Sequence, residues 1–210
     1  MKILKTLLLI LIFSPLGLFA GQTDSTFLSK NSVVRVFPQK EFRAIYKTTI
    51  DFKDKSFSGL LLVRENIDSS FRIAFVTEVG MKIFEFEFFP RQKNAFHVVS
   101  ILSYLDKAII IKTLKRDFES IFMVFTAFKT PNIKPLEKDL YIYKYCYEGK
   151  RSYLVQGKKI QNMSRFKFFF PKEEIHFTYT NRIIPQLIKF HHFGVKLDIE
   201  MKLIKVTYSD

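Results

Sequence analysis

Hydrophobic and polar residues alternate along four apolar-rich segments between residues 42 and 89. In the first segment Phe42, Ala44 and Tyr46 fall on one face and Arg43 on the other. A period of two residues is typical of a β-strand with one buried and one solvated face. Short polar breaks separate the segments and predict tight turns. The pattern therefore predicts an antiparallel meander with a phenylalanine-rich face that must be covered by something.

The period changes to a helical one over residues 106–122. Ile110, Leu114 and Phe118 recur every four residues there, Glu119 falls on the opposite, polar side, and Asp106 is the expected N-cap. The proline-rich stretch 130–135 predicts a loop. Strand patterns then continue to the end of the chain, and Pro171 to Glu174 predicts a turn between two of these strands. The sequence thus predicts an α+β fold, mostly antiparallel β, with ten or eleven strands and one clear helix.

Residues 1–20 have the pattern of a secretory signal peptide. Lys2 and Lys5 precede an apolar run at 7–13, and Ala20 supplies the small residue at the cleavage site. We expect cleavage after Ala20, an irregular N-terminal arm over 21–41 with a short strand at 32–37, and one domain over 42–210. The single cysteine, Cys146, excludes an internal disulfide. These features indicate an exported protein of the bacterial periplasm.

The sequence is rich in aromatic residues and has an excess of basic residues. The chain has 25 Phe and 9 Tyr and a formal net charge of +14. An excess of positive charge is informative about binding partners and not about the fold. The candidate partners are nucleic acid, anionic membrane surfaces and acidic proteins. Export argues against nucleic acid. The alternative is a basic surface that keeps the protein soluble and has no dedicated partner; in either case we expect a monomer.

No familiar catalytic or metal-binding motif is present in the sequence. His191 and His192 are adjacent on a predicted strand, so their side chains should point to opposite faces and not share a metal. We therefore expect a protein that is not an enzyme and has no cofactor and no metal. A buried cluster of two acids, or of a histidine and an acid, at the mouth of a cavity would instead favour an enzyme acting on an acyl or glycan substrate.

The order of these segments resembles a known family. The segments are F-S-G-L-L-L-V-R (57–64), F-R-I-A-F-V-T-E-V-G (71–80) and K-I-F-E-F-E-F (82–88), followed by the helix and a closing hairpin over 185–206. This pattern is similar to the bacterial lipoprotein-localisation family of LolA and LolB, over residues 42–206. The resemblance implies an open, half-closed β-barrel of about eleven strands, with one or more helices covering the concave face and a cavity that receives acyl chains.

The resemblance also implies a set of ligand-binding residues. Inward-facing apolar side chains of the meander and of the helix would line the cavity: Tyr46, Leu61, Ile73, Phe75, Phe84, Phe86, Phe88, Ile110, Leu114 and Phe118. Basic residues at the rim, with Arg43, Lys47, Arg72 and Lys82 as candidates, would meet anionic head groups. The expected partners are acyl chains of lipids or lipoproteins, which the protein would carry or chaperone. The alternative is an exported basic interaction scaffold with a closed core and no lipid ligand.

Overall fold

The computed structural model describes residues 33–37, 41–90 and 95–208, which all belong to one compact unit, Val33–Asp210. The expected signal peptide and most of the N-terminal arm lie outside the described residues. In the part of the arm that is described, residues 33–37 form no strand, contrary to expectation. Val36 and Phe37 are buried there, and the Phe37 ring stacks on Phe42 with a centroid distance of 5.2 Å. This part of the arm is thus held by side-chain packing.

The described residues form one sheet of twelve strands in the order β5-β4-β3-β2-β1-β12-β11-β10-β9-β8-β7-β6. Every neighbouring pair is antiparallel. The strands are β1 (Phe42–Phe52), β2 (Lys55–Glu65), β3 (Phe71–Thr77), β4 (Lys82–Phe88), β5 (Phe96–Ile101), β6 (Asn132–Glu137), β7 (Leu140–Cys146), β8 (Lys150–Gln156), β9 (Lys159–Lys167), β10 (Phe170–Thr178), β11 (Leu187–His192) and β12 (Leu197–Tyr208). The two meanders join where β12 pairs with β1, and the edge strands β5 and β6 do not pair with each other, so the sheet stays open.

This architecture confirms the expected fold class, an open antiparallel sheet with a helix on one face. Two local expectations were wrong. The stretch expected as a loop at 130–135 contains the start of β6, where Pro135 is tolerated because β6 is an edge strand. A turn expected from Pro171 to Glu174 lies instead at Phe168 and Phe169, and Pro171 and Glu173 belong to β10.

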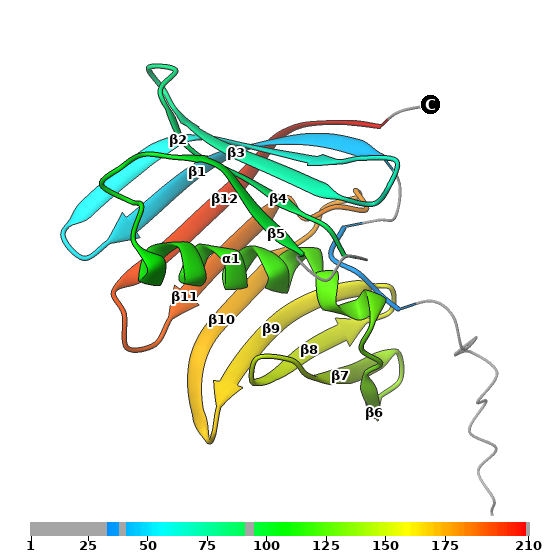
Figure 1. Ribbon diagram of the computed structural model, residues 1–210. Helices are drawn as coiled ribbons and strands as arrows, with labels where there is room; N and C mark the ends of the chain where they lie inside the picture. Colours follow the sequence, from blue (N-terminus) through cyan, green and yellow to red (C-terminus); the bar gives the residue numbers. More distant parts are fainter. Residues whose placement is uncertain (1–32, 38–40, 91–94, 209–210) are drawn as a thin grey trace, which may run out of the picture. The chain divides into compact units, whose positions relative to one another are not determined.

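One α-helix, α1 (Ala108–Phe122), lies against one face of the sheet (Figure 1) and leads into the short 3₁₀ helix η2 (Val124–Ala127). The N-cap is Lys107, which makes no side-chain capping bond, so the expectation for Asp106 was wrong. Among the described residues, no helix has the length and apolar content needed to span a bilayer.

The core runs along both meanders, and its phenylalanine-rich part lies between α1 and the strands of the first meander. The ring of Phe122 stacks on that of Phe71, with ring centroids 4.4 Å apart. The ring centroid of Phe118 lies 6.1 Å from that of Phe84 and 6.4 Å from that of Phe88. Such aromatic contacts add to the stabilisation that comes from removing the rings from water. The phenylalanine-rich face predicted from the sequence is thus covered mainly by the C-terminal half of α1.

Candidate ligand-binding site

An apolar pocket of about 240 Å³ lies beside the N-terminal half of α1. Its walls come from α1, from the segment before it, from β1 to β4 and from the start of β12. The lining residues are Ile50, Phe52, Phe57, Phe75, Ile83, Phe84, Leu105, Ile109, Ile110, Thr113, Leu114, Arg116, Val195 and Leu197. All except Thr113 and Arg116 are apolar. A concave apolar site with few polar groups is the usual form of a small-molecule binding site.

The structure brings four of the ten predicted binding residues to this pocket: Phe75, Phe84, Ile110 and Leu114. The other six are Tyr46, Leu61, Ile73, Phe86, Phe88 and Phe118, which are at most 3% exposed and do not line it. Their side chains fill the interior. The pocket is therefore confined to one end of the space that the sequence pattern had assigned to a ligand.

Several lining residues were not among the predicted ones. Ile50, Phe52 and Leu197 lie at the strand ends that meet this end of α1, and their inward orientation follows from the same alternation. Ile83 breaks the alternation. The β3–β4 register shifts at Phe75, so that Ile83 becomes an extra residue on β4 and both Ile83 and Phe84 are buried. A β-bulge of this kind re-aims a side chain, and an alternation pattern does not reveal it.

Arg116 is the one charged residue of the pocket lining. Its Nε atom is buried and has no hydrogen-bond partner among the described residues. Burial lowers the pKa of Arg116, the charge of Arg165 lowers it further, and the carboxylates of Asp117 and Glu173 act in the opposite direction. An anionic group in the pocket would therefore find a partly desolvated guanidinium with an unused donor.

Next to the pocket is a buried ion-pair cluster formed by Asp117, Arg165, Glu173 and His192. The Arg165 Nε donates to Glu173 Oε2 at 2.7 Å, and the His192 Nε2 lies 3.0 Å from Asp117 Oδ1. The other ring nitrogen of His192, Nδ1, lies 3.0 Å from the Leu197 carbonyl oxygen. Each of the four side chains is at most 4% exposed. The cluster joins α1 to β9, β10 and β11.

The ring of His192 faces an acceptor on each nitrogen, so the imidazolium form satisfies both contacts. Burial by itself lowers the pKa of His192, but the hydrogen bond and charge of Asp117, the charge of Glu173 and the Leu197 carbonyl together raise it above its usual value. Burial raises the pKa of Glu173, and the charge of Asp117 adds to this. The cluster therefore holds protons more tightly in the folded protein than in the unfolded one.

Asp117, Glu173 and His192 place three metal-type donor atoms within 4.8 Å of one another. However, the guanidinium of Arg165 already binds Glu173, and Arg116 lies close enough to act on both carboxylates. A divalent cation would add positive charge beside the buried guanidinium of Arg165 and the partly buried guanidinium of Arg116, which is electrostatically unfavourable. We therefore assign the cluster to the attachment of the helix.

A buried histidine–acid cluster is also the feature that would favour an enzyme. None of Asp117, Glu173 and His192 lines the apolar pocket, although their neighbours Arg116 and Leu197 do. A molecule held in the pocket would contact the neighbours and not the cluster. The geometry thus offers a binding site next to a structural cluster.

Glu119 is the clearest departure from the expected helix polarity. Glu119 was expected on the solvated side of the helix, yet it is 0% exposed. The Lys115 Nζ lies 3.0 Å from Glu119 Oε1, and the Tyr147 hydroxyl donates to the same oxygen at 3.4 Å. Burial raises the pKa of Glu119. Strand β8 and the turn before it supply Tyr147, Arg151 and Tyr153 to this side of α1, so part of the polar side of the helix is covered as well.

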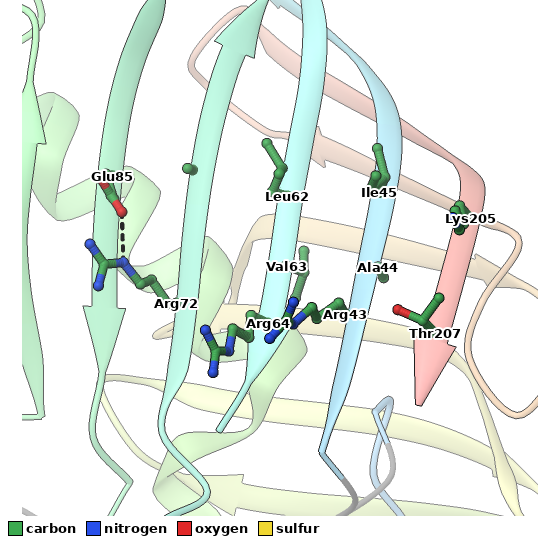
Figure 2. Close-up of a pocket in the computed structure, with 11 residues that line it drawn as sticks. Arg43, Ala44, Ile45, Leu62, Val63, Arg64, Arg72, Glu85, Lys205 and Thr207 are labelled. Atoms are coloured by element: carbon green, nitrogen blue, oxygen red, sulfur yellow. Dashed lines mark hydrogen bonds and ion pairs between the residues drawn. The ribbon is translucent and has the colours of Figure 1, made fainter. Parts of the chain in front are cut away.

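The basic residues expected at the rim of the cavity lie elsewhere. Arg43 and Arg72 line a hollow of about 380 Å³ on the outer face of the sheet, together with Arg64 and Lys205 (Figure 2). The strand register places Arg43 opposite Arg64 and Arg64 opposite Arg72. The Arg72 Nε is paired with Glu85 at 2.6 Å. These cations therefore project away from the apolar pocket, and Arg116 is the basic residue at its wall.

Comparison with solved structures shows which known proteins share this fold. A LolA superfamily protein from Nitrosomonas europaea superposes with a TM-score of 0.56 at 10% identity, covering 84% of this chain and 89% of that one. The chain therefore shares the fold of this LolA superfamily protein. A DUF1329 family protein from Desulfovibrio piger is also similar, with a TM-score of 0.51 at 6% identity over 83% of this chain and 88% of that one.

Similarity at this level of identity concerns the fold alone. No family model matches the sequence. No curated protein matches it either. The likeness to these proteins is thus visible in the structure but not in residue-by-residue sequence similarity.

Proposed function

We propose that this chain is an exported periplasmic protein that binds an acyl chain of a lipid or lipoprotein in the apolar pocket. It would act as a monomeric carrier or chaperone in outer-membrane biogenesis. The observation that carries the proposal is the pocket itself, an unfilled apolar space under the helix of a LolA-superfamily fold. The signal-peptide pattern at residues 1–20 supports export.

The pocket volume sets the size of the ligand. At roughly 30 Å³ per group, the volume of one water molecule in the liquid, 240 Å³ holds about eight chain carbons. Burial at about 0.8 kcal/mol per methylene then gives about 6 kcal/mol, or a dissociation constant near 10⁻⁵ M. The described conformation therefore fits part of one acyl chain, and a ligand with several chains would require α1 to move.

Arg116 predicts how an anionic ligand would be oriented in the pocket. Its guanidinium lies at the pocket wall with an unpaired Nε, and a carboxylate or phosphate would provide the missing acceptor. A fatty acid or a phospholipid with an anionic head group would bind with its head toward Arg116. A neutral acyl ester would bind through its chain only.

A pocket-filling variant tests the proposal. Thr113 lines the pocket from α1, and Thr113→Trp places an indole in the space that the chain would occupy. Titration with a fluorescent fatty acid should show binding in the micromolar range to the parent protein and at least tenfold weaker binding to Thr113→Trp. Lys112→Trp is the matched control, because Lys112 is exposed on the same helix and does not line the pocket.

Two results would contradict the proposal. One is a parent protein that does not bind the probe and carries no acyl compound in native mass spectrometry after purification from its own host. The other is Thr113→Trp binding as tightly as Lys112→Trp. Arg116→Met separates the head-group contribution, since it should weaken the binding of fatty acids more than that of their methyl esters.

The interaction scaffold without a lipid ligand is the second candidate. It is favoured by the filled part of the interior, where six of the ten predicted binding residues pack away from the pocket. In that case fatty-acid probes would not bind, and the outer-face cations would attract acidic partners with an affinity that falls steeply with salt. The probe titration therefore separates the two candidates.

A further inference from the structure

The turn between β9 and β10 carries three consecutive exposed phenylalanines. Phe168, Phe169 and Phe170, here called the Phe tip, are 78%, 90% and 67% exposed. The turn projects at the lower end of the sheet in Figure 1. Other strand turns carry fewer exposed apolar residues: Ile67 stands alone, and Val79 is separated from Met81 by a glycine. A run of three large aromatic side chains in water is unfavourable and has no role in the core.

Turn chemistry does not explain these residues. Lys167 pairs with Phe170, so the loop consists of Phe168 and Phe169 alone. Two-residue hairpin loops favour Asn, Asp and Gly, because at least one residue takes a positive φ. Phe168 has φ of 57°, a conformation that costs roughly 1–2 kcal/mol for a residue with a side chain. The chain therefore places phenylalanine where folding alone would favour a small polar residue.

The surroundings of the Phe tip indicate what it contacts. Lys167 is exposed on one side, and the Lys172 ammonium on the other lies 5.9 Å from the Phe170 ring centroid. Aromatic side chains enter the interfacial region of a bilayer, while lysines beside them reach the head groups with their ammonium groups. The formal net charge is +14 for the whole sequence and +12 without residues 1–20, which contain Lys2, Lys5 and no acidic residue. This charge attracts the protein to an anionic surface in the same way.

We propose that the Phe tip inserts into the surface of a bilayer that contains anionic phospholipids, with Lys167 and Lys172 at the phosphate groups. This goes beyond the acyl-binding pocket and does not depend on it. The tip is a contact made by the protein with the membrane, whereas the pocket encloses a single chain. If the experiment rules out membrane insertion of the Phe tip, the proposal of an acyl-binding pocket is unaffected, and the reverse also holds.

The absence of tryptophan from the sequence allows a direct test. Phe169→Trp introduces a single indole at the most exposed position of the tip, and Val79→Trp introduces one at the turn between β3 and β4, where Val79 is 89% exposed. Vesicles of phosphatidylglycerol and phosphatidylcholine should shift the emission of Phe169→Trp to shorter wavelength. Brominated acyl chains in the vesicles should quench it. Val79→Trp should show neither effect.

A loss-of-contact variant completes the test. Phe169→Ser/Phe170→Ser should lower the vesicle partition coefficient about tenfold or more for each ring lost from the bilayer. Its urea unfolding should match that of the parent, because both side chains are solvated in the folded protein.

The proposal is overturned if Phe169→Trp does not respond to vesicles, if Val79→Trp responds equally, or if the double-serine variant binds like the parent. A blue shift that depends on protein concentration and needs no vesicles would overturn it in favour of contact between two copies of the chain.

Discussion

The attachment of α1 through His192 gives the sharpest test of the structure. His192→Leu removes the partner of Asp117 and leaves that carboxylate buried without its hydrogen bond. Breaking a buried, hydrogen-bonded ion pair by removing one member costs about 3–5 kcal/mol. A domain of this size has a total stability of about 5–15 kcal/mol. The variant should therefore lose a large, measurable part of its unfolding free energy.

The loss of unfolding free energy caused by His192→Leu should decrease as the pH rises. The pKa of His192 in the folded protein is raised above its ordinary value, about 6.5 in the unfolded chain. The stability contributed by protonated His192 is then fully present below about pH 6.5 and is lost as the pH rises through the folded pKa. The difference between parent and His192→Leu should be largest at pH 5.5 and smaller at pH 8.5.

Urea unfolding at the two pH values, followed by far-ultraviolet circular dichroism, measures this difference. The control is His191→Leu, one residue away. His191 Nδ1 lies 2.7 Å from Asp198 Oδ1, but both side chains are 55% exposed, so the pair should contribute at most about 1 kcal/mol. An equal cost at both pH values, or an equal cost for the two histidines, would refute the assignment of His192 as a buried imidazolium.

Three further predictions concern the packing of the sheet. Tyr46→Phe should cost about 1 kcal/mol in urea unfolding, because it removes the 3.1 Å hydrogen bond that the Tyr46 hydroxyl donates to the Pro185 carbonyl; an unchanged midpoint would contradict this. Gly59→Ala should cost about 1–3 kcal/mol, since its Cβ would lie 2.2 Å from the Val76 carbonyl oxygen, and a neutral effect would show that β2 and β3 are more widely spaced. Arg165→Met should cost about 3 kcal/mol by leaving Glu173 unpaired, and the double variant with Glu173→Met should recover much of the loss; a double variant less stable than Arg165→Met would rule out ion pairing as the cause.

Much of the fold followed from local patterns. The alternation in residues 42–52 correctly placed Phe42, Ala44 and Tyr46 inside and Arg43 outside, because a strand of any sheet turns successive side chains to opposite faces. The adjacent His191 and His192 likewise point to opposite faces, one exposed and one buried. The helix was predicted to within two residues at its start because its apolar side chains repeat with the helical period.

The burial of the polar side of α1 could not be predicted in this way. A helix with Lys115, Arg116 and Glu119 on one side is expected to expose that side to water. The second meander returns along it and supplies Tyr147 and Arg151 as partners. These partners lie about 30 residues away in the chain, so no local pattern connects them to the helix.

For the alternating strand residues and the apolar side of the helix, the sequence by itself determined which side chains face the interior, because the strand and helix periods are properties of the local backbone. Only the tertiary structure decided which of those side chains pack against one another and which border empty space. The β-bulge that turns Ile83 inward and the position of α1 along the sheet set the limits of the pocket. Volume is left over only where the facing elements fail to fill it, and that depends on contacts between distant parts of the chain.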